Sequence, residues 1–280
     1  MLNIPVYSEY RGEKNIALLD NSTVSFMMQL EQGGCNPDYL LQGYDVIFLP
    51  GWVAEEVQDS EYRVGYVEAL YQRGLPICLI REEFYSDLMD NEELYLYHIV
   101  KASVSRLGAF LKYIRLYVDK KDPLDMEAYE KWIRDMYSNW PLISDVTAAG
   151  RIKKKNAGEI SLTILAEIFS WHYSNTEMLT VYTQDTDAYA FQKAAEEKLK
   201  KLFPNEMPVS VTYRSNDSIL CQLYRDGKIG KEMIVELRKN ARLVTYTVMR
   251  GDRTFAVEVR VLANDEFLKL IQDDFAQIIF

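Results

Sequence analysis

Five short apolar runs along the chain are each bounded by a polar, turn or proline residue. They span residues 16–20, 45–49, 76–80, 179–183 and 209–213. Runs of this length suit strands that are buried on both faces, as in a parallel sheet. The stretches between them look helical, at residues 22–32, 53–72, 158–173, 189–202 and 218–224. This alternation predicts an α/β fold with a central, mostly parallel sheet and right-handed crossovers.

Residues 82–150 fall outside this alternation and contain no convincing strand. Between positions 96 and 118, apolar residues recur every three or four positions and define one helix face. A second helix is expected over residues 126–137, after Pro123. We therefore predict a helical insertion that packs on the sheet domain. Its apolar face belongs either to the core or to a subunit interface.

The C-terminal part changes to a period of two on both sides of Gly251-Asp252. This pattern predicts an antiparallel hairpin with one solvated face. A terminal helix over residues 265–276 should pack on it. The predicted organisation is an α/β domain in two parts, residues 1–81 and 151–230, interrupted by the insertion at 82–150 and extended by the hairpin and helix at 231–280.

Composition narrows the class of protein. The 280 residues are 48% hydrophobic and 26% charged, which fits a globular chain. The formal net charge of −10 argues against a wholly basic nucleic-acid binder, although it allows a local basic patch. Three cysteines and two histidines are scattered, so neither a zinc site nor a disulfide framework is expected. No secretory signal or apolar stretch of membrane-spanning length occurs, which predicts a cytoplasmic protein without a membrane partner.

Acidic residues stand close to the ends of the predicted strands. Asp20 closes the first strand, Asp185 follows the fourth, and Glu159 begins the helix before that fourth strand. Ligands of doubly wound sheets bind beyond the carboxyl ends of the strands. If the strands that carry Asp20 and Asp185 are neighbours, three or four carboxylates converge on one pocket.

Clustered carboxylates repel one another unless a proton or a cation neutralises them. Mg²⁺ and Mn²⁺ prefer carboxylate oxygen and water to imidazole or thiolate. One or two such ions can activate water and stabilise phosphoryl transfer. The expected chemistry is therefore phosphodiester hydrolysis by metal-activated water.

Four segments carry a family resemblance: Leu18-Leu-Asp-Asn-Ser22, Phe48-Leu-Pro-Gly-Trp-Val-Ala-Glu-Glu-Val57, Ala157-Gly-Glu-Ile-Ser161 and Val181-Tyr-Thr-Gln-Asp-Thr-Asp187. In order and register they resemble the motifs of PIN-like domains, which are metal-dependent nucleases, mostly ribonucleases, and include many bacterial toxins. The resemblance covers residues 16–80 and 150–230 and implies a three-layer α/β/α fold. The insertion and the C-terminal hairpin depart from compact members of the family.

The resemblance also assigns the acidic positions. The first acid of the family falls on Asp20, the third on Glu159 and the fourth on Asp185. The second falls best on Glu56, with Glu55 as its rival by one position. These four acids are the implied catalytic set, and Asp20, Glu159 and Asp185 are the implied ligands of Mg²⁺ or Mn²⁺.

Three further residues follow from the same motifs. Asp187 is the implied auxiliary metal ligand, and Asn21 and Ser22 match the polar residues that often follow the first acid of the family. An ordinary structural explanation exists for these acids as well. Asp187 can cap the helix that starts near position 188, and Asp20 can serve as a turn acid.

The densest basic cluster, Arg151 with Lys153, Lys154 and Lys155, lies just before Glu159. Cations are unfavourable at a helix N-terminus, so this position suggests a phosphate-bearing partner. A solvated loop is the alternative explanation.

We therefore expect a Mg²⁺- or Mn²⁺-dependent nuclease that acts on RNA rather than DNA, and the resemblance adds a toxin-like or defence role. The alternative is a catalytically inactive PIN-like scaffold for protein interaction, which the net charge favours. A homo-oligomer or a protein inhibitor as partner is left open.

Overall fold

A computed structural model describes residues 2–90, 92–119, 126–146, 150, 152–251 and 253–280. Its centre is a five-stranded parallel sheet, which confirms the predicted α/β class. The strand order is β3 (Ile77–Ile80), β2 (Val46–Pro50), β1 (Asn15–Leu19), β6 (Met178–Tyr182) and β7 (Val211–Arg214). Central strand β1 pairs with β2 on one side and β6 on the other, so Ile16 lies between Val46 and Leu179.

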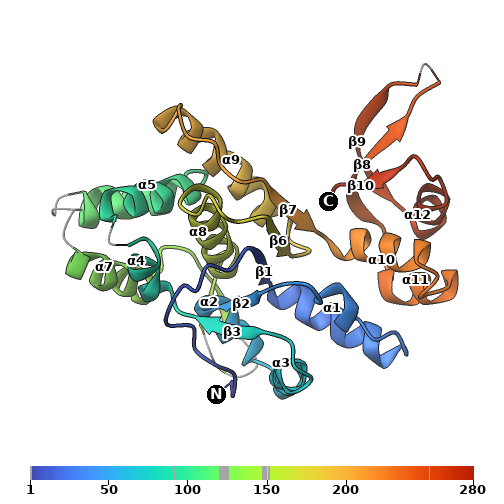
Figure 1. Cartoon of the computed structure of the whole chain (residues 1–280), viewed down its shortest axis with the longest axis horizontal. Helices are drawn as coiled ribbons and strands as arrows, with labels where there is room; N and C mark the ends of the chain where they lie inside the picture. Colours follow the sequence, from blue (N-terminus) through green and yellow to red (C-terminus); the bar gives the residue numbers. More distant parts are fainter. Residues whose placement is uncertain (1, 91, 120–125, 147–149, 151, 252) are drawn as a thin grey trace.

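Helices flank this sheet, and their starts are set by residues at the strand ends (Figure 1). The first half of the sheet is connected by α1 (Asn21–Gln32), α2 (Gly51–Val57) and α3 (Glu61–Gln72). Asp20 caps α1 by accepting a hydrogen bond from the Asn21 N–H. Asp185 caps α9 (Thr186–Leu202), and Ser215 caps α10 (Asn216–Arg225), in the same way. Three strand-to-helix turns at the carboxyl edge therefore carry a capping side chain.

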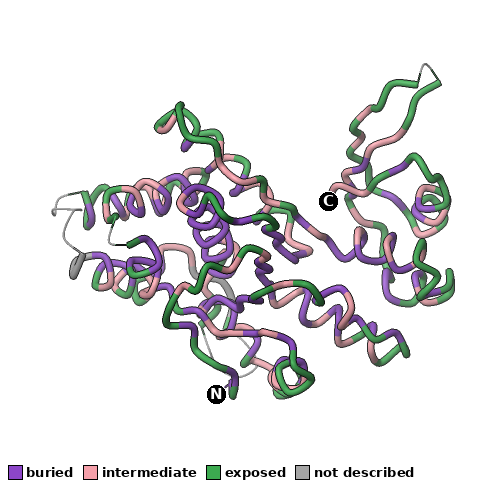
Figure 2. The backbone as a smooth tube through the Cα atoms, in the orientation of Figure 1, coloured by how far each residue is buried: buried purple, intermediate pink, exposed green. Residues whose placement is uncertain are grey.

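Helix α8 (Ala157–Trp171) is the central helix of the core. Every residue from 160 to 171 is buried, because α8 packs between the sheet and helices α2, α5 (Glu93–Ser103) and α9 (Figure 2). A helix that is apolar on all sides is expected in such a position. The Phe169 ring of α8 stacks on Phe48 of β2 with centroids 5.4 Å apart.

The inserted segment is mainly helical, as predicted, but more broken than its periodicity suggests. It contains η2 (Glu82–Phe84), α4 (Tyr85–Leu88), α5, α6 (Gly108–Tyr113), the π-helical turn η3 (Ile114–Val118) and α7 (Met126–Ser138). The expectation that it holds no strand is wrong, because β4 (Ile143–Val146) pairs with β5 (Ile152–Lys154). Three-residue and four-residue spacing identifies a helix face, but it does not reveal where the backbone leaves the helix.

The C-terminal part forms its own small sheet, drawn in orange and red in Figure 1. Strands β8 (Arg242–Met249) and β9 (Phe255–Leu262) form the predicted antiparallel hairpin, and β10 (Gln277–Ile278) pairs with β8. Helices α10, α11 (Lys231–Arg238) and α12 (Asn264–Ile271) pack beside it. Helix α12 ends at Ile271, so the terminal helix is shorter than the predicted 265–276. Position 252 of the predicted turn lies outside the described residues.

A helix that spans a bilayer must be long and predominantly apolar. None of the described helices combines the length and the hydrophobicity that a bilayer span requires.

Candidate functional site

The candidate site lies where the sheet reverses its strand order, between β1 and β6. Helices α1 and α9 both begin at this edge, directly after these strands. Loops diverge at such a switch point, which makes it the usual ligand position in an open α/β sheet. Asp20 reaches this point because it directly follows β1. Asp185 reaches it because it follows β6 after a short turn and comes directly before α9.

Asp20 is buried and held by three donors. The Asn21 N–H lies 2.8 Å from Oδ1, the Thr183 hydroxyl lies 2.9 Å from Oδ2, and the Ser22 hydroxyl also donates to Oδ2. Burial raises the pKa of Asp20, these hydrogen bonds oppose the rise, and repulsion from Asp185 adds to it. The position of this carboxylate is therefore fixed by its neighbours rather than by a basic partner.

The carboxyl group of Glu159 lies close enough to Asp185 and Asp20 for both to influence its pKa. Burial raises the pKa of Glu159 well above its ordinary value, and the hydrogen bond to Asp185 and repulsion from Asp20 and Asp185 raise it further. Neighbouring carboxylates repel one another when ionised, which favours the protonated form of Glu159. No ion pair found among the described residues involves Asp20, Glu159 or Asp185. The cluster therefore lacks a compensating cation from the described part of the chain.

Glu56 approaches the same cluster, whereas its neighbour Glu55 is engaged elsewhere. A methyl group at the Cα of Gly158 would lie 3.6 Å from Glu56 Oε1 and 3.9 Å from Asp20 Oδ1. Both carboxylates thus face the start of α8, where glycine leaves room for them. Glu55 Oε2 instead accepts a hydrogen bond from the Tyr137 hydroxyl of α7. Between the two rival positions, the geometry brings Glu56 to the cluster.

Asp187 is placed differently from the other acids. Its side chain is exposed in the first turn of α9, and its backbone N–H donates to Asp185 Oδ1 at 2.7 Å. Among the interactions of the described residues, none joins its carboxylate to the cluster.

The two polar residues after Asp20 differ in what they offer a ligand. The Ser22 hydroxyl binds Asp20 and accepts the Gln184 N–H at 3.1 Å, so it fixes the β1 and β6 turns to each other. The Asn21 Oδ1 is buried and has no hydrogen-bond partner in the described structure. Buried amide oxygens usually accept a hydrogen bond, so this oxygen is an exception.

The basic residues lie on the strand that leads into α8. Lys153 and Lys155 are exposed, and Lys154 Nζ lies 3.2 Å from the centroid of the Tyr137 ring. Lys155 also accepts the Trp140 indole N–H on its backbone oxygen at 2.9 Å. Arg151 lies outside the described residues. Strand β5 ends at Lys154, and Lys155 and Asn156 form the turn before α8, so the lysines lie near Glu159 in the chain.

Three residues at the same edge escaped the sequence reasoning. Thr183 ends the apolar run of β6 and binds Asp20, and Gly158 leaves the space into which two carboxylates point. Glu82 follows β3 and is buried, and burial raises its pKa to about 8. Its Oε1 accepts the Trp52 N–H at 2.9 Å and the Ser161 hydroxyl at 2.6 Å. An acid two positions beyond an apolar run is the available signal for Glu82, whereas Gly158 has none of its own.

The oxygen atoms of the candidate site are of the kind that a hard cation prefers, but their arrangement in the described structure does not form a metal site. Carboxylates and an unpaired amide oxygen are the ligands that Mg²⁺ and Mn²⁺ prefer. However, no three His, Cys, Asp or Glu side chains of the described residues are disposed so that they could hold a metal ion as they stand. Hydrogen bonds within the cluster take the place of metal bonds, and Glu159 must lose its proton before it could bind a cation.

Comparison of the chain with known protein families, with curated proteins and with solved structures gives no match. The likeness to PIN-like domains therefore rests on the motifs and their placement at one edge of the sheet.

Proposed function

We propose that this protein is a Mg²⁺- or Mn²⁺-dependent phosphodiesterase, a nuclease that acts on RNA rather than DNA. The observation that carries the proposal is the approach of Asp20, Glu159 and Asp185 from three separate elements. The Thr183 hydroxyl bonds both the Asp20 carboxylate and the Asp185 N–H, and repulsion from Asp20 and Asp185 raises the pKa of Glu159. Bringing a buried and two partly buried carboxyl groups together is unfavourable in a purely structural role, since each repels the others. Such groups are typically retained where a ligand compensates them.

Asp20, Glu159 and Asp185 would hold the cation, with Glu56 beside them and Asp187 able to approach from the start of α9. When bound, a divalent cation lowers the pKa of water and offsets negative charge on a phosphoryl group. Thr183 and Ser22 orient Asp20. The lysines at 153–155 would bind the phosphates of a nucleic-acid strand.

The non-catalytic scaffold remains the second candidate for a specific reason. The acids of the described structure do not form a ready metal site, and the net charge of −10 repels a polyanion away from the local lysines. In that case the acids would be held by protons, and no cation would bind at ordinary pH.

Calorimetric titration with Mn²⁺ separates the two candidates. We expect binding by the intact protein and its loss in Asp20→Asn and Asp185→Asn, while Asp87→Asn, an exposed acid on α4, leaves it unchanged. Circular dichroism checks that each variant is folded. Absence of Mn²⁺ binding by the folded intact protein would overturn the metal-dependent function.

Cleavage of a labelled single-stranded RNA then tests the reaction. Hydrolysis should require Mg²⁺ or Mn²⁺, stop with EDTA, and fall at least ~100-fold in the same two variants, because each removes a charge that the cation needs. Mn²⁺ binding without cleavage of RNA or DNA would retain the metal site but reject the nuclease.

A further inference from the structure

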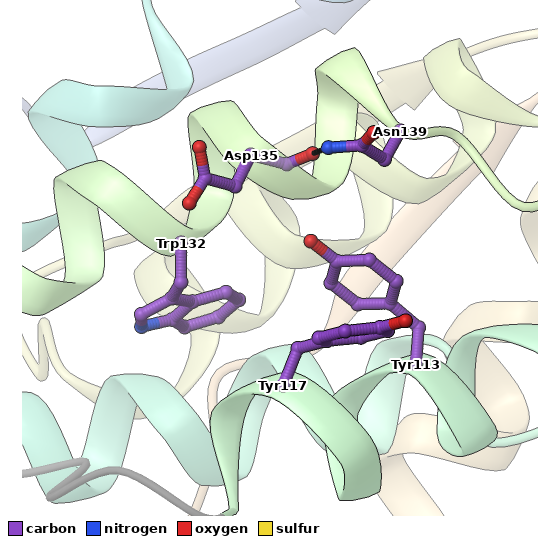
Figure 3. Close-up of a pocket in the computed structure, with 5 residues that line it drawn as sticks. All are labelled: Tyr113, Tyr117, Trp132, Asp135 and Asn139. Atoms are coloured by element: carbon purple, nitrogen blue, oxygen red, sulfur yellow. Dashed lines mark hydrogen bonds between the residues drawn. The ribbon is translucent and has the colours of Figure 1, made fainter.

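A pocket of about 400 Å³ lies in the helical insertion, between the π-helical turn η3 and helix α7 (Figure 3). It is lined by three aromatic rings and two polar side chains: Tyr113, Tyr117, Trp132, Asp135 and Asn139. We refer to these five residues as the aromatic pocket. None of them belongs to the acidic cluster at the sheet edge, so the pocket is a separate feature of the molecule.

The rings surround the space instead of forming two parallel plates. Tyr113 and Tyr117 are in contact, with centroids 4.8 Å apart and planes inclined by 42°, and Trp132 comes from the opposite helix (Figure 3). A flat ring such as a nucleobase needs two roughly parallel faces with a gap between them. Rings at different inclinations instead enclose a compact, rounded group, and each presents a face of negative electrostatic potential.

The one charged side chain of the pocket is an acid. Asp135 is partly exposed, and its carboxylate has neither an ion pair nor a hydrogen bond among the described residues. Asn139 donates to the Asp135 backbone oxygen at 2.9 Å and therefore does not occupy the carboxylate. No lysine or arginine lines this pocket within the described part of the chain. Burial, followed by repulsion from Asp135, raises the pKa of Tyr113, which also indicates negative potential there.

The walls of the pocket are held by the core. Trp132 is buried and packs edge-on against Tyr129, with centroids 5.1 Å apart. The Tyr129 hydroxyl donates to the backbone oxygen of Glu82 at 3.1 Å. Tyr117 lies within the π-helical turn and Tyr113 directly before it; such turns are rare and frequently occur at functional sites. Walls that are already ordered reduce the conformational entropy that the protein loses on binding.

We propose that the aromatic pocket binds a small organic ammonium cation, of the size of choline. The three ring faces would surround the alkylated nitrogen, and the Asp135 carboxylate would supply the opposite charge. The Asn139 amide lies at the rim, where it can bond a polar group attached to the cation. This site requires no metal and no nucleic acid, so it is independent of the function proposed for the acidic cluster.

Choline and its neutral isostere 3,3-dimethylbutan-1-ol are the probes, titrated into the intact protein by calorimetry in the presence of EDTA. We expect choline to bind and the alcohol to bind at least ~10-fold more weakly, since the two differ in charge and hardly in shape. Equal affinity for both probes would show a purely apolar pocket and overturn the proposal. Absence of heat from choline at the highest usable concentration would overturn it as well.

Two variants locate the binding and two control for their chemistry. Asp135→Asn and Tyr117→Leu should each weaken choline at least ~5-fold, since one removes the charge and the other a ring face. Tyr117 is 56% exposed and Asp135 is partly exposed, so both variants should fold. Tyr62→Leu, at a tyrosine that is 81% exposed, and Asp87→Asn should leave affinity unchanged. Unchanged affinity in Asp135→Asn would reject a charge-based site even if choline binds.

Discussion

The chain packs so closely around Glu82 that position 51 has no room for a side chain. Gly51 is the first residue of α2, and a methyl group on its Cα would lie 2.5 Å from Glu82 Oε2. Glu82 cannot easily move aside, because the Trp52 N–H and the Ser161 hydroxyl both hold its other oxygen. Gly65, inside α3, has no neighbour within 4 Å of the corresponding position.

These two glycines should respond to alanine with opposite signs. Gly51→Ala is expected to lower the free energy of unfolding by ~1–3 kcal/mol through overpacking. Gly65→Ala should raise it by ~0.5–1 kcal/mol, since alanine is the better helix former and meets no obstacle. Urea unfolding of the two variants beside the intact protein measures both. A gain in stability for Gly51→Ala would show that Glu82 is free to shift.

The acidic residues of the candidate site differ in how well the sequence predicts that they lie there. Asp20 and Asp185 stand directly beyond apolar runs, and the parallel topology necessarily brings such positions to one edge. The choice between Glu55 and Glu56 depends on Tyr137, which lies about 80 positions away and binds Glu55. Pairing over such a distance leaves no local pattern, so sequence reasoning alone could not decide it.

Helices and strands could be predicted where the periodicity of apolar residues determines them. They could not be predicted where tertiary contacts determine where an element ends. The five sheet strands and the β8–β9 hairpin follow from their patterns, whereas the predicted helix at 53–72 is two helices, α2 and α3. The register of the hairpin could not be predicted from the pattern either. Val244 pairs with Arg260, and Thr245 pairs with Val259. The apolar rows of the two strands therefore lie on opposite faces. As a result, four alternate residues of β9 are more than half exposed: Phe255, Val257, Val259 and Val261.

One buried ion pair joins the three C-terminal helices. Arg238 of α11 is fully buried, its Nε lies 3.1 Å from Asp217 Oδ2 of α10, and its Nη1 donates to Asn264 Oδ1 of α12 at 3.0 Å. The guanidinium also lies over the Phe267 ring, 4.4 Å from its centroid. Arg238 thus contacts both of the helices that flank α11.

Removing only the cation should cost more than removing both charges. Arg238→Met is expected to lower the free energy of unfolding by ~3–5 kcal/mol, because Asp217 stays buried with Arg242 as its remaining cationic partner. The double variant Asp217→Leu with Arg238→Met should be more stable than the single variant, since the fully buried carboxylate is removed as well and the remaining Arg242 is partly exposed to solvent. Denaturant unfolding of both provides the comparison. A double variant that is the less stable of the two would assign the pair a net stabilising role.

The molecule as a whole buries two further acids outside the candidate metal ligands. Glu82 lies at the end of β3, and Glu167 lies in the middle of α8, where its Oε2 accepts the Trp171 indole N–H at 2.7 Å. Burial raises the pKa of each to about 8, from an ordinary value of 4.5. In the folded protein both groups therefore keep their protons at a pH where the unfolded chain has lost them.

Stability should consequently fall as pH rises. Between the unfolded and folded pKa values the native state binds more protons than the unfolded chain, so the free energy of unfolding decreases with pH. We expect a decrease of ~2 kcal/mol or more from about pH 5 to about pH 8.5. Urea unfolding at several pH values measures it. Glu82→Gln and Glu167→Gln should each flatten the profile, and Glu197→Gln, an exposed acid of α9, should not. A profile that rises with pH in this range would contradict the protonated state of both acids.

The position of β1 in the middle of the sheet also matters while the protein is being made. Thr183 and Asp20 are hydrogen-bonded although they are 163 positions apart, and β1 pairs with β6 across its whole length. A ribosome that has synthesised only β1, β2 and β3 carries a chain whose central strand still has one open edge, and neither Glu159 nor Asp185 yet exists. The acidic cluster therefore cannot assemble before β6 and Asp185 have been synthesised.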